Sequence, residues 1–211
     1  MKIIFLDIDG VLNSNEWYIE RQQNPKFEPK SMSRDEFKRW EFSPALVLNL
    51  NEIIEQTGAK IVVSSTWRRG YDIEGLQKLF KSVGIIGEVV GLTPSMHSPK
   101  GVKENYTIPR GCEISYWLKS HGFQRINWSK EKQLEYLEKS FVKNYVIIDD
   151  DSDMLLCQRE HFVKTTSREG LTENLSNECI EILNKSIIDL YYEVDNVFYD
   201  ENVYESGGSG Q

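Results

Sequence analysis

The sequence lacks the features that would place it in a membrane, in the secretory pathway or among disulfide-rich proteins. No apolar run approaches the roughly 20 residues that a membrane-spanning helix needs. Asp7 interrupts the apolar N-terminus before a signal-peptide core can form. The three cysteines, Cys112, Cys157 and Cys179, are widely spaced and odd in number, which argues against a disulfide framework and a CxxC zinc site. We expect a cytoplasmic protein with free thiols and no membrane partner.

An excess of positive charge is also missing. The 25 lysine and arginine residues are outnumbered by 33 aspartates and glutamates, which gives a net charge of −8 at pH 7. This total alone argues against a protein that coats nucleic acid. However, residues 187–211 contain six acids and no lysine or arginine. The rest of the chain is therefore close to neutral, and a local basic groove is compatible with its composition.

Short apolar segments alternate with segments of helical periodicity. Residues 2–6, 60–63, 88–91 and 145–148 are apolar, β-prone runs, typical of strands that are buried on both faces of a parallel sheet. Helices are expected at residues 44–57, 73–83, 111–121 and 129–141, the first with Pro44 at its start and Gly58 at its end. This alternation predicts an α/β fold: a doubly wound, mainly parallel sheet with helices on both faces, in three Rossmann-like layers.

Two segments depart from the alternation. Residues 13–41 are polar, and from 21 to 41 they carry six bases and four acids. We interpret them as a small insert over the carboxyl end of the first strand, with one short helix at 33–40. Residues 187–211 form an acidic tail that ends in Ser-Gly-Gly-Ser-Gly-Gln, a linker-like sequence. The predicted organisation is thus a core domain at 1–186, which includes the insert, and a tail at 187–211.

Acidic residues follow two of the predicted strands directly. Asp7 and Asp9 come after the first, next to a glycine that permits a sharp turn, and Asp149, Asp150, Asp151 and Asp153 come after the strand at 145–148. The carboxyl ends of parallel strands share one edge of a sheet, so the two clusters can meet there. Adjacent carboxylates need a cation or a shared proton, and oxygen ligands favour Mg²⁺. The alternative, surface acids that cap turns and helices, is disfavoured by the presence of both clusters at strand ends.

These motifs carry a resemblance to a known family. Residues 7–12 (DIDGVL) after a hydrophobic strand, Ser64 after residues 61–63, and Asp149-Asp150 after residues 146–148 resemble the haloacid dehalogenase superfamily of phosphotransferases. More narrowly, residues 63–68 (VSSTWR), 110–114 (RGCEI), 148–154 (IDDDSDM) and 170–172 (GLT) are similar to the haloacid dehalogenase-type domain of multi-enzyme RNA-repair proteins. The resemblance spans roughly residues 1 to 185.

The resemblance implies a role for each acid. Asp7 would be the nucleophile that forms an aspartyl-phosphate, and Asp9 the general acid and base. Mg²⁺ would be held by Asp7, the main-chain carbonyl of Asp9, and Asp150. Asp149 and Asp153 would lie behind these ligands or act through a water.

The resemblance also implies groups that contact the phosphate. Ser64 would donate a hydrogen bond to the transferring phosphoryl oxygens, and Ser65 and Arg68 are expected to bind substrate. A cation must neutralise the developing phosphoryl charge, and we favour Arg110, which can make a bidentate contact. Lys130 and Lys132 are the alternatives, since many relatives place this lysine just before the strand at 145–148.

The predicted function is that of a Mg²⁺-dependent phosphomonoesterase, an enzyme of the hydrolase class. Neither the insert nor residues 93–110 is long enough for a large cap, so we expect a shallow site that admits a polymer end. The favoured substrate is a nucleic-acid terminal phosphate, specifically a 3′-phosphate. The alternatives are a phosphatase for nucleotides or other small molecules, and a non-catalytic module that recognises phosphate.

Overall fold

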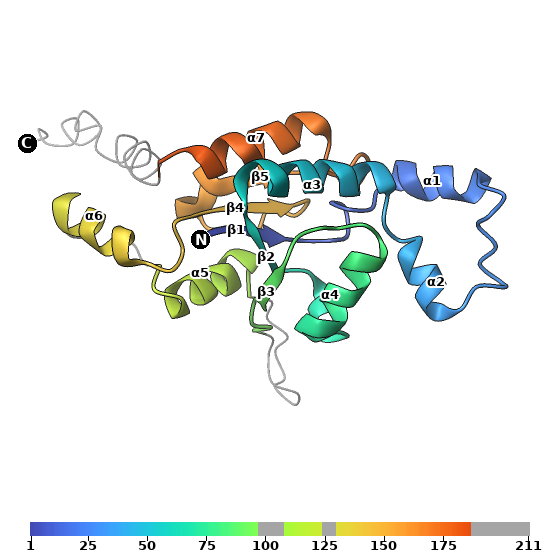
Figure 1. Ribbon diagram of the computed structural model, residues 1–211, viewed down its shortest axis with the longest axis horizontal. Coiled ribbons are helices and arrows are strands. Elements are labelled where there is room, and N and C mark those ends of the chain that lie inside the picture. Colours follow the sequence, from blue (N-terminus) through green and yellow to red (C-terminus); the bar gives the residue numbers. More distant parts are fainter. Residues whose placement is uncertain (97–107, 124–129, 187–211) are drawn as a thin grey trace, which may run out of the picture.

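The computed structural model describes residues 1–96, 108–123 and 130–186, and its centre is a parallel β-sheet (Figure 1). Five strands in the described residues all run parallel in the order β3-β2-β1-β4-β5. They are β1 (Lys2–Leu6), β2 (Lys60–Val63), β3 (Val89–Leu92), β4 (Asn144–Asp149) and β5 (Phe162–Lys164). The strand order reverses direction between β1 and β4, which confirms the predicted doubly wound sheet.

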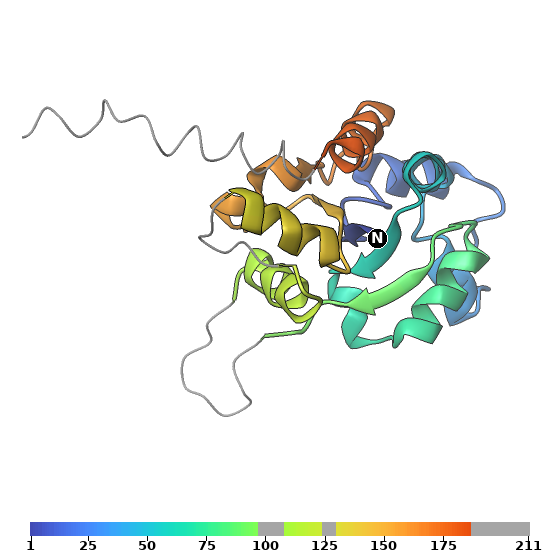
Figure 2. The same cartoon turned by 60° about the vertical axis from the view of Figure 1, so that its left-hand side comes forward.

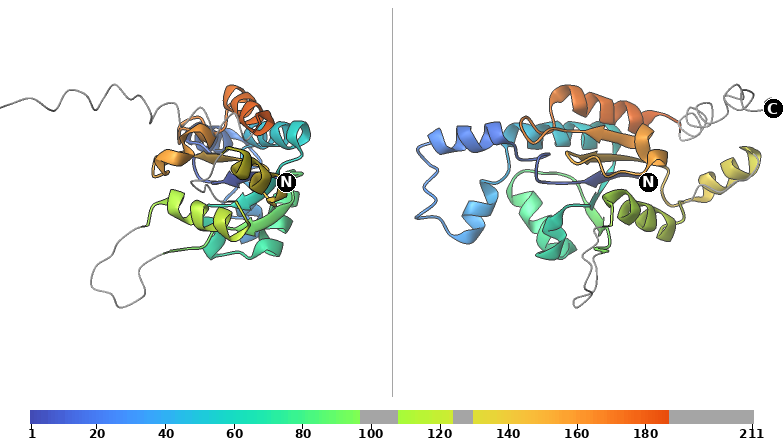
Figure 3. Two further views of the ribbon diagram at one scale, coloured as in Figure 1. Left: turned by 90° about the vertical axis from the view of Figure 1, so that its left-hand side faces the viewer. Right: turned by 180° about the vertical axis from the view of Figure 1, so that it is seen from behind.

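Helices cover both faces of this sheet, as Figures 2 and 3 show. One face packs against α3 (Pro44–Thr57), α4 (Ile73–Ser82) and α7 (Glu173–Asn184), and the other against α5 (Arg110–Ser120). Side chains alternate along β1, so that Ile4 lies in the first core and Phe5 lies in the second, with its ring edge-on to Trp117. No helix in the described ranges combines the length and the apolar character needed to cross a membrane.

The predicted ends of elements agree with the structure where local signals are strong. Helix α3 begins at Pro44, and Gly58 ends it with a φ of 66°, a conformation that glycine adopts without steric cost. The strands predicted at 88–91 and 145–148 lie at 89–92 and 144–149. Two short 3₁₀ helices, η1 (Thr66–Arg69) and η2 (Leu156–His161), follow β2 and precede β5, and α6 (Lys130–Lys139) precedes β4.

Besides the two 3₁₀ helices, one strand and two α-helices in the described residues were not predicted from the sequence. Strand β5 has only three residues, too few for a visible alternation. Helix α7 buries Cys179, Ile180 and Leu183 beneath a polar surface, and α1 (Asn15–Gln23) buries only Trp17. Helices α1 and α2 (Arg34–Arg39) lie beyond the carboxyl end of β1 in Figure 1, so the segment predicted to hold one helix holds two. The acidic tail at 187–211 lies outside the described residues.

Candidate active site

Strand register brings three distant segments of the chain to one edge of the sheet. Leu6, at the end of β1, is paired with Val63 of β2 and with Ile148 of β4. The next residue, Asp7, donates its amide N–H to the Ile148 carbonyl at 3.0 Å. Asp7, Ser64 and Asp149 therefore follow aligned positions on three adjacent strands, at the point where the strand order reverses. Ligands bind at such points in α/β sheets.

Three carboxylates cluster at this edge. Asp7, Asp149 and Asp150 each offer an oxygen atom, and these oxygens lie within 4.8 Å of one another. Asp7 and Asp149 are buried, with exposed fractions of 7% and 1%. Among the described residues, Asp149 Oδ2 has no hydrogen-bond partner. A buried oxygen without a partner beside two further carboxylates fits a divalent cation with oxygen ligands. The structure thus brings Asp149 into the cluster, whereas the sequence placed it behind the ligands.

The environment of the cluster favours uncharged carboxyl groups in the absence of a cation. Burial raises the pKa of Asp7, although a hydrogen bond from Ser65 and the charge of Arg110 oppose this rise. Burial and the negative charge of Asp7 raise the pKa of Asp149 to about 7. Burial and the charge of Asp151 raise the pKa of Asp150. A bound divalent cation would relieve this repulsion and allow all three groups to ionise.

The stability of the metal-free protein should therefore depend on pH through Asp149. Its pKa is raised from the ordinary value of 3.8 to about 7, so the folded chain binds more protons than the unfolded chain between these two pH values. Stability must then fall as pH rises from about 4 to about 7. In thermal unfolding experiments with EDTA, the Asp149→Asn variant should be more stable than the wild type at pH 7.5. The difference in stability should be smaller at pH 5. Equal stability of the two proteins at pH 7.5 would contradict the buried repulsion.

Gly10, three residues after Asp7, allows the Asp150 side chain to approach. Gly10 has a φ of +72°, and a Cβ atom added there would lie 2.2 Å from Asp150 Oδ2. The Gly10 amide donates to Asn13 Oδ1 at 2.8 Å, and the Gly10 carbonyl accepts a hydrogen bond from Thr165 Oγ1 at 2.8 Å. The turn after β1 is thus held against the end of β5, in a shape that only glycine accommodates.

Asp9 lies outside the carboxylate cluster and is exposed. Its Oδ1 accepts a hydrogen bond from Asn13 Nδ2 at 2.9 Å, and its Oδ2 accepts one from Trp67 Nε1 at 3.0 Å. The Nζ atom of Lys38, in α2, lies 4.1 Å from the centroid of the Trp67 ring. Neither Asn13 nor Trp67 was among the predicted site residues. Asn13 is close to Asp9 in sequence, but nothing in the pattern indicates that Trp67, 58 residues away, orients it.

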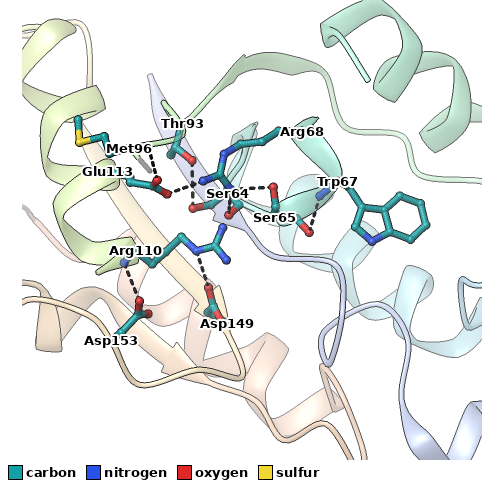
Figure 4. Close-up of polar contacts among 10 residues, drawn as sticks. All are labelled: Ser64, Ser65, Trp67, Arg68, Thr93, Met96, Arg110, Glu113, Asp149 and Asp153. Atoms are coloured by element: carbon teal, nitrogen blue, oxygen red, sulfur yellow. Dashed lines mark hydrogen bonds and ion pairs between the residues drawn. The ribbon is translucent and has the colours of Figure 1, made fainter. Parts of the chain in front are cut away.

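Arg110 lies beside Asp149, one member of the carboxylate cluster, as Figure 4 shows. It is the first residue of α5, its Nε is 3.8 Å from Asp149 Oδ2, and its side chain is 13% exposed. Among the described residues, Arg110 Nη1 is buried without a partner, so it remains available to an anion at this edge. The Arg110 amide donates to Asp153 Oδ2 at 2.7 Å. Asp153 therefore satisfies the N-terminus of α5 and is exposed, and its predicted role behind the metal ligands or through a water stays a prediction.

The alternative cations belong to a different part of the molecule. In Figure 1, α6 lies near the amino end of β1, opposite the edge that carries Asp7. The chain after α6 returns to that amino end, where the Lys143 amide donates to the Met1 carbonyl at 2.7 Å. Lys132 is exposed there, and the side chain of Lys130 lies outside the described part of the chain. The structure thus brings Arg110, and not Lys132, to the acids.

The two serines after β2 have different surroundings. Ser64 is 1% exposed, and its Oγ accepts a hydrogen bond from Thr93 Oγ1 at 3.4 Å. Ser65 is fully buried, its Oγ accepts a hydrogen bond from the Trp67 amide at 3.4 Å, and its hydroxyl lowers the pKa of Asp7. Both hydroxyls lie at the end of β2, and the contact between Ser64 and the phosphoryl group stays a prediction.

Arg68 differs from its expected role as a substrate contact. Its Nη2 lies 2.5 Å from Glu113 Oε2, and both side chains are almost fully buried, with 5% and 4% exposed. Its Nη1 donates to the carbonyls of Ser64 and Ser65, each at 2.7 Å. Arg68 therefore braces the end of β2 and links it to α5 (Figure 4). The sequence could not indicate this pairing because Glu113 lies 45 residues away on the buried face of a helix.

The parallel sheet with acids after β1 and β4 and hydroxyls after β2 defines a haloacid dehalogenase (HAD) domain. The family described as "HAD domain in Swiss Army Knife RNA repair proteins" matches residues 3–175, and the chain belongs to this family. No curated protein and no solved structure matches the chain. The predicted resemblance is confirmed, and at the level of the family it supports a phosphatase-type function.

Proposed function

We propose that the protein is a Mg²⁺-dependent phosphomonoesterase with Asp7 as its nucleophile. The observation that carries this proposal is that a buried acceptor and a buried donor, neither of them hydrogen-bonded to a described residue, lie together at one edge of the sheet. Among the described residues, Asp149 Oδ2 is buried without a hydrogen bond in the cluster of three acids, and Arg110 Nη1 is buried without an acceptor beside them. Asp7, Asp149 and Asp150 would hold the ion, with the main-chain carbonyl of Asp9. When bound, Mg²⁺ would supply positive charge that stabilises the phosphoryl oxygens.

The side chains then divide the reaction into two steps. A carboxylate oxygen of Asp7 forms a bond to phosphorus while the bond to the leaving-group oxygen breaks, and Asp9 gives its proton to that oxygen. In the second step Asp9 takes a proton from water as the water oxygen attacks phosphorus, which releases phosphate and restores the Asp7 carboxylate. Arg110 Nη1 would donate to a phosphoryl oxygen. The Ser65 hydroxyl, which lowers the pKa of Asp7, would orient the nucleophile.

We further propose that the substrate is a nucleic-acid end that carries a 3′-phosphate. Asp9 is exposed, so a leaving group longer than a sugar can extend from it into solvent. Membership of a family of RNA-repair domains supports the same substrate class. A nucleotide or another small phosphate ester is the alternative, as is a phosphate-recognition module without catalysis.

A substrate panel tests this proposal directly. Phosphate release should be measured from 3′- and 5′-phosphorylated oligonucleotides, mononucleotides, sugar phosphates and an aryl phosphate, with Mg²⁺ and with EDTA. We expect release that EDTA abolishes, with kcat/KM at least about tenfold higher for the 3′-phosphorylated strand than for a mononucleotide. A preference for sugar phosphates would contradict the nucleic-acid substrate. No release from any compound would leave the recognition module as the correct alternative.

Asp9→Asn is expected to separate catalysis from metal binding. Removal of a general acid and base lowers turnover by about 10²-fold or more, and the loss should be larger for an alkyl than for an aryl phosphate, because the better leaving group needs less protonation. Mg²⁺ affinity, measured by calorimetry, should change by less than about threefold, since only the Asp9 carbonyl is a proposed ligand. A comparable loss of metal affinity would contradict this assignment.

A further inference from the structure

A groove between α2 and α4 carries basic and aromatic residues that the proposed chemistry does not use. It encloses about 280 Å³ and is lined by Lys38 and Arg39 from α2, by Tyr71, which precedes α4, and by Lys78 from α4. Asp35 is the acid that lines it. A second cavity of about 240 Å³ shares Arg39 and Ser82 with the first, and its wall is aromatic, with Trp17, Trp40 and Phe42.

The Trp67 side chain connects the groove to Asp9, the proposed general acid. Trp67 donates its indole N–H to Asp9 Oδ2 at 3.0 Å, and its ring lies nearly parallel to that of Tyr71, with the centroids 6.3 Å apart. Lys38 places its Nζ 4.1 Å from the centroid of the same Trp67 ring. Trp67 thus touches Asp9 and two residues that line the groove. A leaving group that departs at Asp9 is therefore linked to the groove through the Trp67 side chain.

The cations of the groove are available to an anionic ligand. In the described ranges neither Lys38 nor Arg39 forms an ion pair with a carboxylate. Lys78 pairs with Glu74 at 2.7 Å, but both side chains are about three-quarters exposed. An exposed pair of this kind contributes little stability and exchanges readily for another anion.

We propose that this groove binds the sugar-phosphate backbone of a single-stranded nucleic acid whose phosphorylated end lies at Asp7. The inference rests on the proposed function, because it takes the direction of the strand from the position of Asp9 on the leaving-group side. Arg39 and Lys78 contact backbone phosphates, and the aromatic walls of the two cavities accept bases. Grooves that combine cations with aromatic faces bind single strands in this way. An acidic peptide would use the cations and leave the aromatic walls without a partner.

Direct binding tests the groove without any catalytic turnover. The probe is a 5′-labelled single-stranded oligonucleotide with a free 3′-hydroxyl, and its binding to the full chain is followed by fluorescence anisotropy at several salt concentrations. The test variant is Arg39→Gln with Lys78→Gln. The matched control, Lys81→Gln with Lys119→Gln, removes the same charge at two exposed lysines that do not line the groove. All four positions are at the surface, so we expect each variant to fold.

We expect the groove variant to weaken binding at least about tenfold and to reduce the slope of log K against log salt by about 1.4, the value for two phosphate contacts on a single strand. The control should stay within about twofold of the wild type. Absence of binding by the wild type would overturn the proposal, as would equal losses in both variants. Equal competition by a poly-glutamate of matched charge would also overturn it, because the site would then recognise charge alone.

The test of strand binding and the test of phosphatase activity can fail independently. Hydrolysis of an aryl phosphate by a chain that does not bind the strand would retain the phosphatase and reject the groove. Strand binding that depends on Arg39 and Lys78, in a chain that releases no phosphate, would retain the groove and reject the catalytic proposal.

Discussion

The Asp7→Asn protein is expected to fold and to release no measurable phosphate. An amide cannot form the bond to phosphorus, so the covalent route is lost, and we expect turnover to fall by about 10³-fold or more. Asparagine has nearly the same size as aspartate and keeps an oxygen atom that can accept a hydrogen bond at this position. It also removes one charge from a buried cluster of three acids, so the metal-free variant should be at least as stable as the wild type.

The measurement is phosphate release under single-turnover conditions, together with thermal unfolding to show that the variant is folded. Asp153→Asn is the matched control, because it makes the same chemical change at an exposed acid whose carboxylate accepts from the Arg110 amide. Its activity should remain within a few-fold of the wild type. A folded Asp7→Asn protein that keeps more than a tenth of the wild-type rate would exclude Asp7 as the nucleophile.

Gly10→Ala is expected to remove both Mg²⁺ binding and activity. Two effects coincide at this position: a φ of +72°, which L side chains rarely adopt, and a Cβ atom that would lie 2.2 Å from Asp150 Oδ2. The backbone strain costs about 1–2 kcal/mol. Relief of the clash must displace either the turn after β1 or the Asp150 carboxylate, and each movement separates Asp150 from Asp7. We expect Mg²⁺ affinity to fall at least about tenfold and turnover about 10²-fold.

Gly58→Ala is the control that separates strain from displacement. Gly58 also has a positive φ, +66°, but an added Cβ there meets nothing within 4 Å. It should lose stability to a similar extent while Mg²⁺ affinity, measured by calorimetry, stays unchanged. If Gly10→Ala binds Mg²⁺ as tightly as Gly58→Ala does, Asp150 is not held in place by the absence of a side chain at Gly10.

Elements with strong local patterns could be predicted from the sequence. The strand at 2–6 is a continuous apolar run, and α3 has a proline start and a glycine stop, so their limits follow from short-range preferences. Strand β5 and helix α7 could not be predicted in this way. The three residues of β5 are fixed by pairing with β4, and α7 is stabilised by packing against α3 and β4. Such elements depend on contacts with distant segments of the chain.

The same division applies to the site. The positions of Asp7 and Asp149 at strand ends could be predicted because parallel strands end at a common edge. The residue that each site side chain contacts could not be predicted from the sequence. Asp9 is held by Trp67, and Arg68 is paired with Glu113, contacts that join residues tens of positions apart in the chain.

By itself, the sequence determined the fold class, the family and the set of acids that can perform the chemistry, because these follow from local periodicity and from motifs of a few residues. Only the tertiary structure decided that Asp149 joins Asp7 and Asp150, that Arg110 and not Lys132 lies beside them, and that Arg68 turns inward. The reason is that strand pairing sets which segments meet, whereas the direction of each side chain is set by packing and hydrogen bonds after they have met.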